Sequence, residues 1–236
     1  MIHTLNIKKT CAPSRYLAGL LVLVTVPVWL AWGSVVLAYD FDRLQSALLA
    51  RFGSSQEKTL KRLNTTLEDA RGLDEEDKLV RINDLFNRYI RFEADQDIWG
   101  EEDYWATPLE TIGKGRGDCE DIAIAKYFSL TTAGVPVNKL RLVYVRATVK
   151  HFSGPVQQAH MVLAYYPAPN AEPLILDNLV ARIRPAGQRR DLLPIFSFNS
   201  EAIWSGVSAS ASKDPGSRQM TRWQDLQQRT RTEGFE

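Results

Sequence analysis

The chain has 236 residues, which is enough for one sizeable hydrophobic core or two small ones. With 44% hydrophobic and 24% charged residues, its composition excludes an intrinsically disordered protein. The 29 basic and 28 acidic residues leave a formal net charge of +1, without the basic excess typical of nucleic-acid-binding proteins. We therefore expect no nucleic acid among its partners.

Residues 1–38 have the pattern of a secretory signal peptide. Three basic residues and no acid precede an uncharged stretch, rich in Leu and Val, over residues 16–39. Small or modest residues close the segment, which predicts cleavage after Ala38 and an exported mature chain of residues 39–236. The alternative is an uncleaved membrane anchor, because 24 uncharged residues are long enough to span a bilayer.

Helical periodicity dominates the first part of the mature chain. Leucine-rich apolar positions recur at helical spacing in three stretches between residues 41 and 91, and Asp74 is a suitable N-cap for the third. An acidic and aromatic loop is expected next, over residues 95–105, and Pro108 ends it.

A buried helix is predicted over residues 119–133. Glycines at positions 113, 115 and 117 lead into it, and it is apolar on nearly every side, as expected inside a core. Gly134 and Pro136 follow in the order that ends a helix.

The remainder of the chain changes to the composition of strands, with β-branched and aromatic runs bounded by Pro, Gly or Asn. The predicted elements are strands at 140–149, 161–166 and 174–176, an irregular or short-strand segment at 185–199, a Ser-rich loop at 205–217 and an amphipathic helix at 220–231. Because helices are followed by strands, we predict that residues 39–236 form a single α+β domain that contains an antiparallel sheet.

The mature chain has one cysteine, Cys119, because Cys11 lies within the signal. A lone cysteine forms no intramolecular disulfide, so its thiol is either buried and inert or chemically employed. Cys119 falls in the first turn of the predicted buried helix, where backbone amides and the helix dipole stabilise a thiolate and an oxyanion. The alternative is a small hydrophobic residue at a helix start.

A cysteine nucleophile needs a base, and the mature chain offers His151 and His160. His160 directly precedes a predicted strand and is favoured, because that position is rigid and still reaches a cleft. Asp177 follows the strand at 174–176, 17 residues later, which suits two neighbouring strands. It would fix the imidazole tautomer and stabilise the imidazolium, although a surface acid at a strand end is the alternative.

Three acids crowd the thiol: Asp118, Glu120 and Asp121. Nearby negative charges disfavour a thiolate, so a nucleophile here requires something that cancels their field. A bound divalent cation would do so, and carboxylates suit Ca²⁺. The sequence therefore suggests a calcium site beside Cys119, with an ordinary acidic N-cap and first turn as the alternative.

Other chemistries find little support. One cysteine and two histidines are too few soft ligands for structural zinc, and no CxxC, HExxH, GxSxG or Walker motif is present. We interpret the basic cluster as a solvated face rather than a nucleic-acid site; its members are Arg182, Arg184, Arg189 and Arg190.

Seven motifs occur in the order found in a known family, and over roughly residues 42–235 the chain resembles the bacterial transglutaminase-like cysteine proteinases, the LapG-type periplasmic adhesin proteases. The motifs are Trp99-Gly100, Asp103-Tyr104-Trp105-Ala106-Thr107-Pro108, Gly117-Asp118-Cys119-Glu120-Asp121, Lys126-Tyr127, Leu140-Arg141-Leu142, His160-Met161-Val162-Leu163 and Leu176-Asp177-Asn178. The resemblance implies a papain/transglutaminase-like fold, with N-terminal helices, a central buried helix carrying the cysteine, and an antiparallel sheet carrying His and Asp. It implies the catalytic triad Cys119, His160 and Asp177, and calcium bound by Asp118, Glu120 and Asp121.

The resemblance also implies a cellular role. Family members cut a large surface adhesin near its N-terminus, at a motif with two adjacent alanines, which releases the adhesin and disperses the biofilm. The periplasmic domain of an inner-membrane cyclic di-GMP receptor sequesters the protease when cyclic di-GMP is high. Two alternatives stay open: another acyl transfer on the same triad, such as transglutamination or peptidoglycan-peptide hydrolysis, and a non-catalytic calcium-binding periplasmic interaction module.

Overall fold

The computed structural model describes residues 39–206 and 217–235, all of which belong to one compact unit. The predicted signal segment lies outside the described residues, as does most of the predicted Ser-rich loop. Among the helices that are described, none combines the length and the apolar character that crossing a bilayer requires.

Three N-terminal helices form as predicted: α1 (Phe41–Phe52), α2 (Glu57–Ala70) and α3 (Glu75–Tyr89). Their apolar stripes are buried in the main core, which is why the periodicity was visible in the sequence. Asp74 caps α3 as expected, since its carboxylate accepts a hydrogen bond of 2.9 Å from the backbone N–H of Asp77.

The segment between α3 and the central helix is more ordered than the sequence suggested. The predicted loop begins with a short helix, α4 (Asp95–Ile98), and the glycine-containing stretch forms α5 (Pro108–Lys114). Two short strands pair in parallel: β1 (Arg91–Phe92), directly after α3, and β2 (Arg116–Gly117), directly before the central helix. They fix the backbone immediately before residue 118.

A capping box starts α5. The Thr107 hydroxyl accepts a hydrogen bond of 3.1 Å from the backbone N–H of Glu110, and the Glu110 carboxylate accepts one of 2.9 Å from the N–H of Thr107. Gly115 ends the helix with a φ of 64°, a left-handed conformation that glycine adopts without strain.

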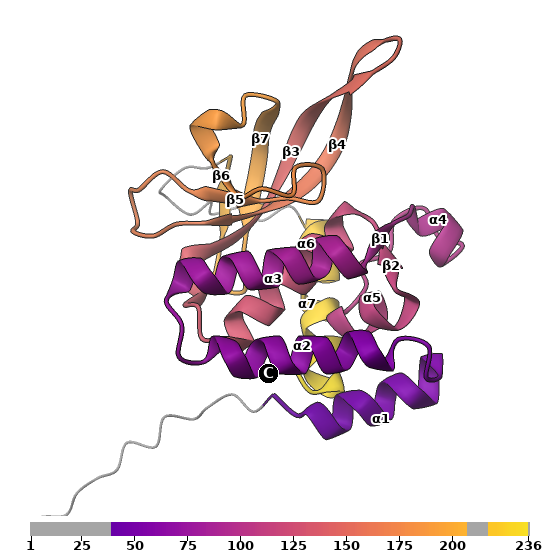
Figure 1. Ribbon diagram of the computed structural model, residues 1–236. Helices are drawn as coiled ribbons and strands as arrows, with labels where there is room; N and C mark the ends of the chain where they lie inside the picture. The colour runs from indigo at the N-terminus through magenta and orange to yellow at the C-terminus, as the bar shows by residue number, and fades with distance from the viewer. Residues whose placement is uncertain (1–38, 207–216, 236) are drawn as a thin grey trace, which may run out of the picture. The chain divides into compact units, whose positions relative to one another are not determined.

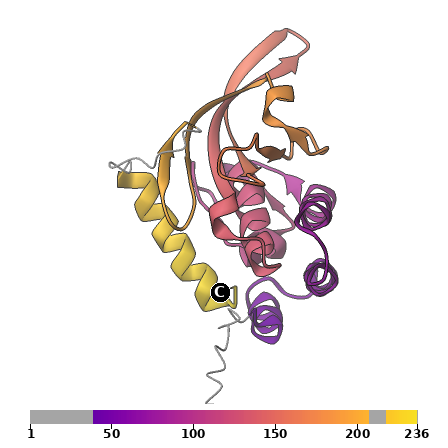
Figure 2. The same cartoon turned by 90° about the vertical axis from the view of Figure 1, so that its left-hand side faces the viewer.

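The central helix α6 (Cys119–Thr132) packs against both layers of the fold. It contacts α3 and α5 on the helical side and β3 and β4 on the sheet side. α2 and α3 lie on one side of α6, and α7 (Ser217–Glu233) lies on the other (Figures 1 and 2). Trp223 of α7 reaches into an aromatic cluster of the core; its neighbours there are Trp105, Tyr127, Phe128 and Phe198.

Six strands form one antiparallel sheet in the order β6-β5-β4-β3-β7-β8. The strands are β3 (Leu140–His151), β4 (Gly154–Tyr165), β5 (Leu174–Leu176), β6 (Arg184–Pro185), β7 (Leu192–Phe198) and β8 (Ile203–Ser205), with 3₁₀ turns η1 (Val137–Lys139) and η2 (Ala186–Gln188). The predicted α+β class with an antiparallel sheet is therefore confirmed.

One strand boundary differs from the prediction. β4 starts at Gly154, so His160 lies inside the strand, opposite Val145 on β3, and does not precede it. Pro155 lies in the part of β4 that pairs only with β3, and a proline is tolerated there because its missing N–H leaves no ladder bond unmade. The placement of His160 in the middle of a paired strand makes its backbone more rigid than expected.

Substitution of Thr107 by alanine should weaken the approach to the central helix. Thr107 is fully buried and supplies the cap of α5, so we expect the free energy of unfolding to fall by about 1–2 kcal/mol. Urea unfolding measures this change, with Thr65→Ala on the exposed face of α2 as the control. Equal stability of the two variants would contradict a stabilising cap.

Candidate active site

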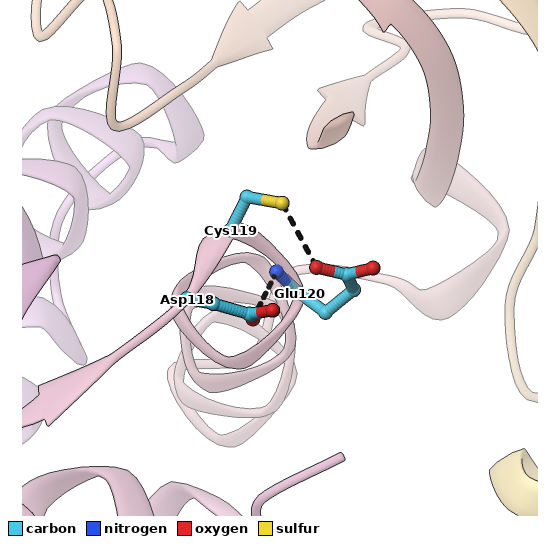
Figure 3. A group of neighbouring side chains, drawn as sticks. All are labelled: Asp118, Cys119 and Glu120. Carbon is cyan, nitrogen blue, oxygen red and sulfur yellow. Dashed lines mark hydrogen bonds between the residues drawn. The ribbon is translucent and has the colours of Figure 1, made fainter. Parts of the chain in front are cut away.

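The thiol of Cys119 lies at the first residue of α6 and is partly buried. It donates a hydrogen bond of 2.8 Å to Oε2 of Glu120 (Figure 3). The backbone of Met161, the residue after His160 on β4, also hydrogen-bonds to the sulfur and favours the thiolate. The sheet therefore reaches the start of the helix next to the predicted base.

The surroundings of the Cys119 thiol favour its protonated form. Burial raises the pKa of Cys119, and the charges of Glu120 and Asp118 and the hydrogen bond to Glu120 raise it further. The helix N-terminus alone would lower this pKa, so the acidic neighbours outweigh the helix dipole. The thiol is thus a neutral group until a base or a positive charge acts on it.

His160 and Asp177 form a buried pair, with 2.8 Å between Nε2 and Oδ1. Asp177 directly follows β5, which pairs with β4 in antiparallel register, so two neighbouring strands bring the two residues together. Because Nε2 is engaged with Asp177, Nδ1 is the ring nitrogen available to a nucleophile. His151 lies at the exposed end of the β3–β4 hairpin, six residues or about 20 Å farther along β3 than the partner of His160.

The Asp177 carboxylate is fully satisfied. Oδ1 also accepts a hydrogen bond of 3.0 Å from the N–H of Leu179, and Oδ2 accepts one of 2.7 Å from Arg189. Burial on its own would raise the pKa of Asp177, but the hydrogen bond and charge of His160, with the hydrogen bonds from the Leu179 N–H and Arg189, lower it to about 2. Asp177 therefore stays ionised at any working pH.

Arg189 is a residue whose place the sequence did not reveal. Its interpretation as part of a solvated face is wrong, because its side chain is only 3% exposed and bridges Asp177 and Asp191 at 2.7 Å each. The 3₁₀ turn η2 carries the chain inward just before it. The other members of that cluster, Arg182, Arg184 and Arg190, are exposed as expected.

Carboxylates gather at the start of α6 in two overlapping groups. Asp118 and Asp121 lie with Asp95 of α4, and each offers an oxygen within 4.8 Å of the others. Asp118 and Glu120 form the second group with the sulfur of Cys119 (Figure 3). Asp95 was not anticipated, and Glu120 already uses its second oxygen to accept a hydrogen bond of 3.1 Å from the Tyr144 hydroxyl.

The first group has the features of a cation site. One oxygen of Asp121 accepts a hydrogen bond of 2.8 Å from the N–H of Ala106, and one of Asp95 accepts a bond of 2.7 Å from the N–H of Tyr104. The second oxygen of each carboxylate is buried and has no hydrogen-bond partner among the described residues. Bare buried carboxylate oxygens are costly, and a hard cation is the ligand that they suit.

The pKa values agree with this view. Burial first, then repulsion from Glu120 and Asp121, raises the pKa of Asp118 to about 10. Burial also raises the pKa of Asp95 to about 6 and that of Asp121 well above its usual range. Without a positive charge, the fold disfavours full ionisation of this group.

A glycine before the helix keeps the group compact. A Cβ at Gly117 would lie 2.8 Å from the Cβ of Asp121, closer than side-chain carbons approach one another. Only glycine lets the backbone of β2 pass this close to the carboxylate.

Comparisons with known proteins agree with the geometry. The family model of the bacterial transglutaminase-like cysteine proteinases (BTLCP) matches residues 53–191. The LapG structure of Legionella pneumophila is 34% identical, covers 81% of this chain and 97% of its own, and has a TM-score of 0.66. Its calcium-bound form (80% and 98%, TM-score 0.68) and its EGTA-treated form (81% and 97%, TM-score 0.69) match at the same identity. No match was found among curated proteins.

Loss of the Asp177 charge should be visible in acid unfolding. Its pKa is lower in the fold than the usual 3.8, so its contribution of about 2 kcal/mol is present above pH 4 and disappears as the pH falls toward 2. We expect the stability difference between wild type and Asp177→Asn to shrink over that interval in urea titrations. Asp69→Asn, at an exposed site on α2, is the control, and a difference that stays constant from pH 5 to pH 2 would contradict the ion pair.

Proposed function

Because this chain belongs to the bacterial transglutaminase-like cysteine proteinase family, we propose that it is a calcium-dependent endopeptidase with the triad Cys119, His160 and Asp177. The observation that carries the proposal is the buried 2.8 Å contact between His160, on the strand β4 that packs against α6, and Asp177, directly after β5. Cys119 is the single cysteine of the described residues and occupies that helix start.

The proposed mechanism assigns one task to each residue. His160 accepts the Cys119 proton at Nδ1, and the thiolate attacks the scissile carbonyl carbon. Backbone amides at the start of α6 stabilise the oxyanion. His160 then protonates the leaving amine, and water hydrolyses the thioester with His160 as the base. Asp177 stays ionised throughout and stabilises the imidazolium.

We propose that Asp95, Asp118 and Asp121 hold the calcium ion. The bare oxygens of Asp95 and Asp121 support this choice of ligands, and the calcium-bound form of the similar LapG supports calcium as the ion. The predicted third ligand, Glu120, lies in the neighbouring group with the thiol. A bound calcium ion supplies positive charge that offsets the carboxylates around Cys119. The protein's own contribution is to aim these carboxylates with the N–H groups of Ala106 and Tyr104.

The proposed cellular role follows the family resemblance. The chain would act in the periplasm, exported by residues 1–38 or anchored by them in the inner membrane. Its substrate would be the N-terminal region of a large surface adhesin, cut at a di-alanine motif, so that cleavage promotes biofilm dispersal. The periplasmic domain of an inner-membrane cyclic di-GMP receptor would control it. The signal-like segment and the 34% identity to LapG support this role.

Cleavage of an N-terminal fragment of the organism's largest adhesin tests the activity. The full chain with Ca²⁺ should make a single cut between small residues, and EGTA should abolish it. Cys119→Ala should remove turnover, and His160→Ala should lower kcat by about 10³-fold or more, because the base is lost. His151→Ala is the matched control and should retain wild-type rates. Fragment mass gives the readout, and a wild-type cut that persists in Cys119→Ala would overturn the triad.

Calcium should stabilise the fold in a pH-dependent way. The pKa values of the proposed ligands are raised, to about 6 for Asp95 and about 10 for Asp118, so protons compete with calcium, and the gain from calcium should shrink steadily as the pH falls from 9 to 5. At pH 7, with Ca²⁺ at roughly 100 times its Kd, we expect Tm to rise by about 5–10 °C over the EGTA-treated protein.

Two variants make the thermal measurement specific. Asp121→Asn should abolish the calcium-dependent rise, whereas Asp97→Asn, an exposed acid on α4, should keep it. A rise of equal size in both variants would place the ion elsewhere.

A further inference from the structure

A buried lysine on the central helix touches the backbone of the proposed catalytic acid. Lys126 is 1% exposed, and its ammonium group donates to the side-chain oxygens of Asn83 (2.9 Å) and Asn87 (2.8 Å). It also donates to the backbone carbonyl of Asp177 at 3.2 Å. Three acceptors match the three hydrogens of an ammonium group, whereas a neutral amine could donate to only two of them.

The two asparagines complete the attachment. Asn87 donates a hydrogen bond of 2.8 Å to the same Asp177 carbonyl, and Asn83 donates one of 2.7 Å to the carbonyl of Ala181. The segment after β5, residues 177–181, is thus tied to α3 at both of its ends. At Asp177 it is tied to α6 as well.

The position of Lys126 along α6 links the Asp177 backbone to the helix that carries Cys119. Lys126 lies seven residues after Cys119, which is about two helical turns, so both residues project from the same face of one helix. One rigid element therefore carries the thiol at its start and, about 10 Å farther along, the donor that holds the backbone of Asp177. The Asp177 side chain in turn orients His160.

The charges around Lys126 favour the ammonium form only narrowly. Burial lowers the pKa of Lys126 to about 7, while the negative charges of Asp177 and Asp84 act in the opposite direction. Arg189 lies on the far side of Asp177, bonded to Oδ2, and His160 is bonded to Oδ1. Burial of a charged lysine is costly in desolvation free energy. Because this lysine lies beside the acid that the mechanism requires, its position indicates a role beyond packing.

We propose that Lys126 is a positioning residue of the proteolytic reaction: it fixes the Asp177 backbone to the helix that carries Cys119, and so keeps His160 in register with the thiol. This inference rests on the proposed triad. A lysine with a purely structural role would change stability without changing the chemistry of Cys119.

The test measures the reactivity of the thiol as well as turnover. The variants Lys126→Met, His160→Ala and Lys78→Met would be compared with wild type in the full chain with Ca²⁺. Lys78 is a second buried lysine, near the start of α3, and is the matched control. Alkylation of Cys119 by iodoacetamide would be followed from pH 5 to pH 9 by peptide mass, which separates it from Cys11. Adhesin-fragment cleavage gives kcat and KM, and thermal unfolding reports the fold.

In Lys126→Met we expect alkylation at pH 6 to slow by about 10-fold or more and the pH profile to move about one unit upward. We expect kcat to fall by about 10–100-fold with KM within about twofold of wild type. Lys78→Met should lower Tm at most and leave the profile and kcat unchanged. If Lys126→Met does not fold, Asn87→Ala removes one of the two side-chain donors to the Asp177 carbonyl and should shift the profile in the same direction by a smaller amount.

The possible negative results separate the positioning role from the triad. A folded Lys126→Met with the wild-type alkylation profile and kcat would overturn the positioning role and leave the triad standing. Wild-type alkylation no faster at pH 6 than that of His160→Ala would overturn the triad itself, and the positioning role with it. A folded Asn87→Ala with an unchanged profile, where Lys126→Met fails to fold, would also overturn the proposal.

Discussion

Negative charge concentrated at the start of α6 is the constraint around which the described structure is organised. Within one turn the helix places a thiol and three carboxylates, and Asp95 of α4 adds a fourth from the facing loop. Coulomb repulsion at such distances is strong in a partly buried setting. Backbone N–H groups of Ala106, Tyr104 and the helix itself bond to these carboxylates, but one buried oxygen of Asp95 and one of Asp121 have no partner among the described residues. The site is a set of anions arranged for a cation.

The opposite pattern surrounds Asp177. This single carboxylate has cationic neighbours on two sides, Arg189 at its side chain and Lys126 at its backbone, with His160 between it and the helix start. The imidazole thus separates an acidic region from one rich in positive charge. In the proposed mechanism, the proton that moves from the thiol to the ring leaves the acidic region, and the ionised Asp177 stabilises the imidazolium that forms. Both regions depend on α6, which contributes Asp118, Asp121 and Lys126.

Much of the scaffold could be predicted because its signals are local. The stripes of α1 to α3, the Asp74 cap and α6, which is apolar on nearly every side, follow from spacing and residue type alone. The pairing of His160 with Asp177 could be expected because a separation of 17 residues suits two adjacent strands, and it is present as a hydrogen bond.

Other parts depend on contacts that no local pattern reveals. Helix α5 is too short for periodicity to register, although its Thr107-Pro108 start and Glu110 form a capping signature that was overlooked. Asp95 meets Asp118 only after 22 intervening positions have folded, and Arg189 is buried, unlike its exposed neighbours, in a position where it bonds its tertiary partner Asp177. The early start of β4 was hidden by Gly154 and Pro155, which resemble a loop in sequence.

The contacts made by α7 can form only late in the synthesis of the chain. Arg229 of α7 donates to the Glu110 carboxylate, the Tyr104 hydroxyl and the Trp105 carbonyl, so residues near the end of the chain hold the loop that leads into α5. The ends of the described segment also meet, since the N–H of Asp40 donates to the carbonyl of Gly234 at 3.0 Å. A chain still being synthesised lacks these contacts until Arg229 and Gly234 have been added. The loop that aims the Ala106 and Tyr104 amides at the acidic group is therefore braced only after the central helix and the sheet have been synthesised, and a chain without α7 would lack this brace.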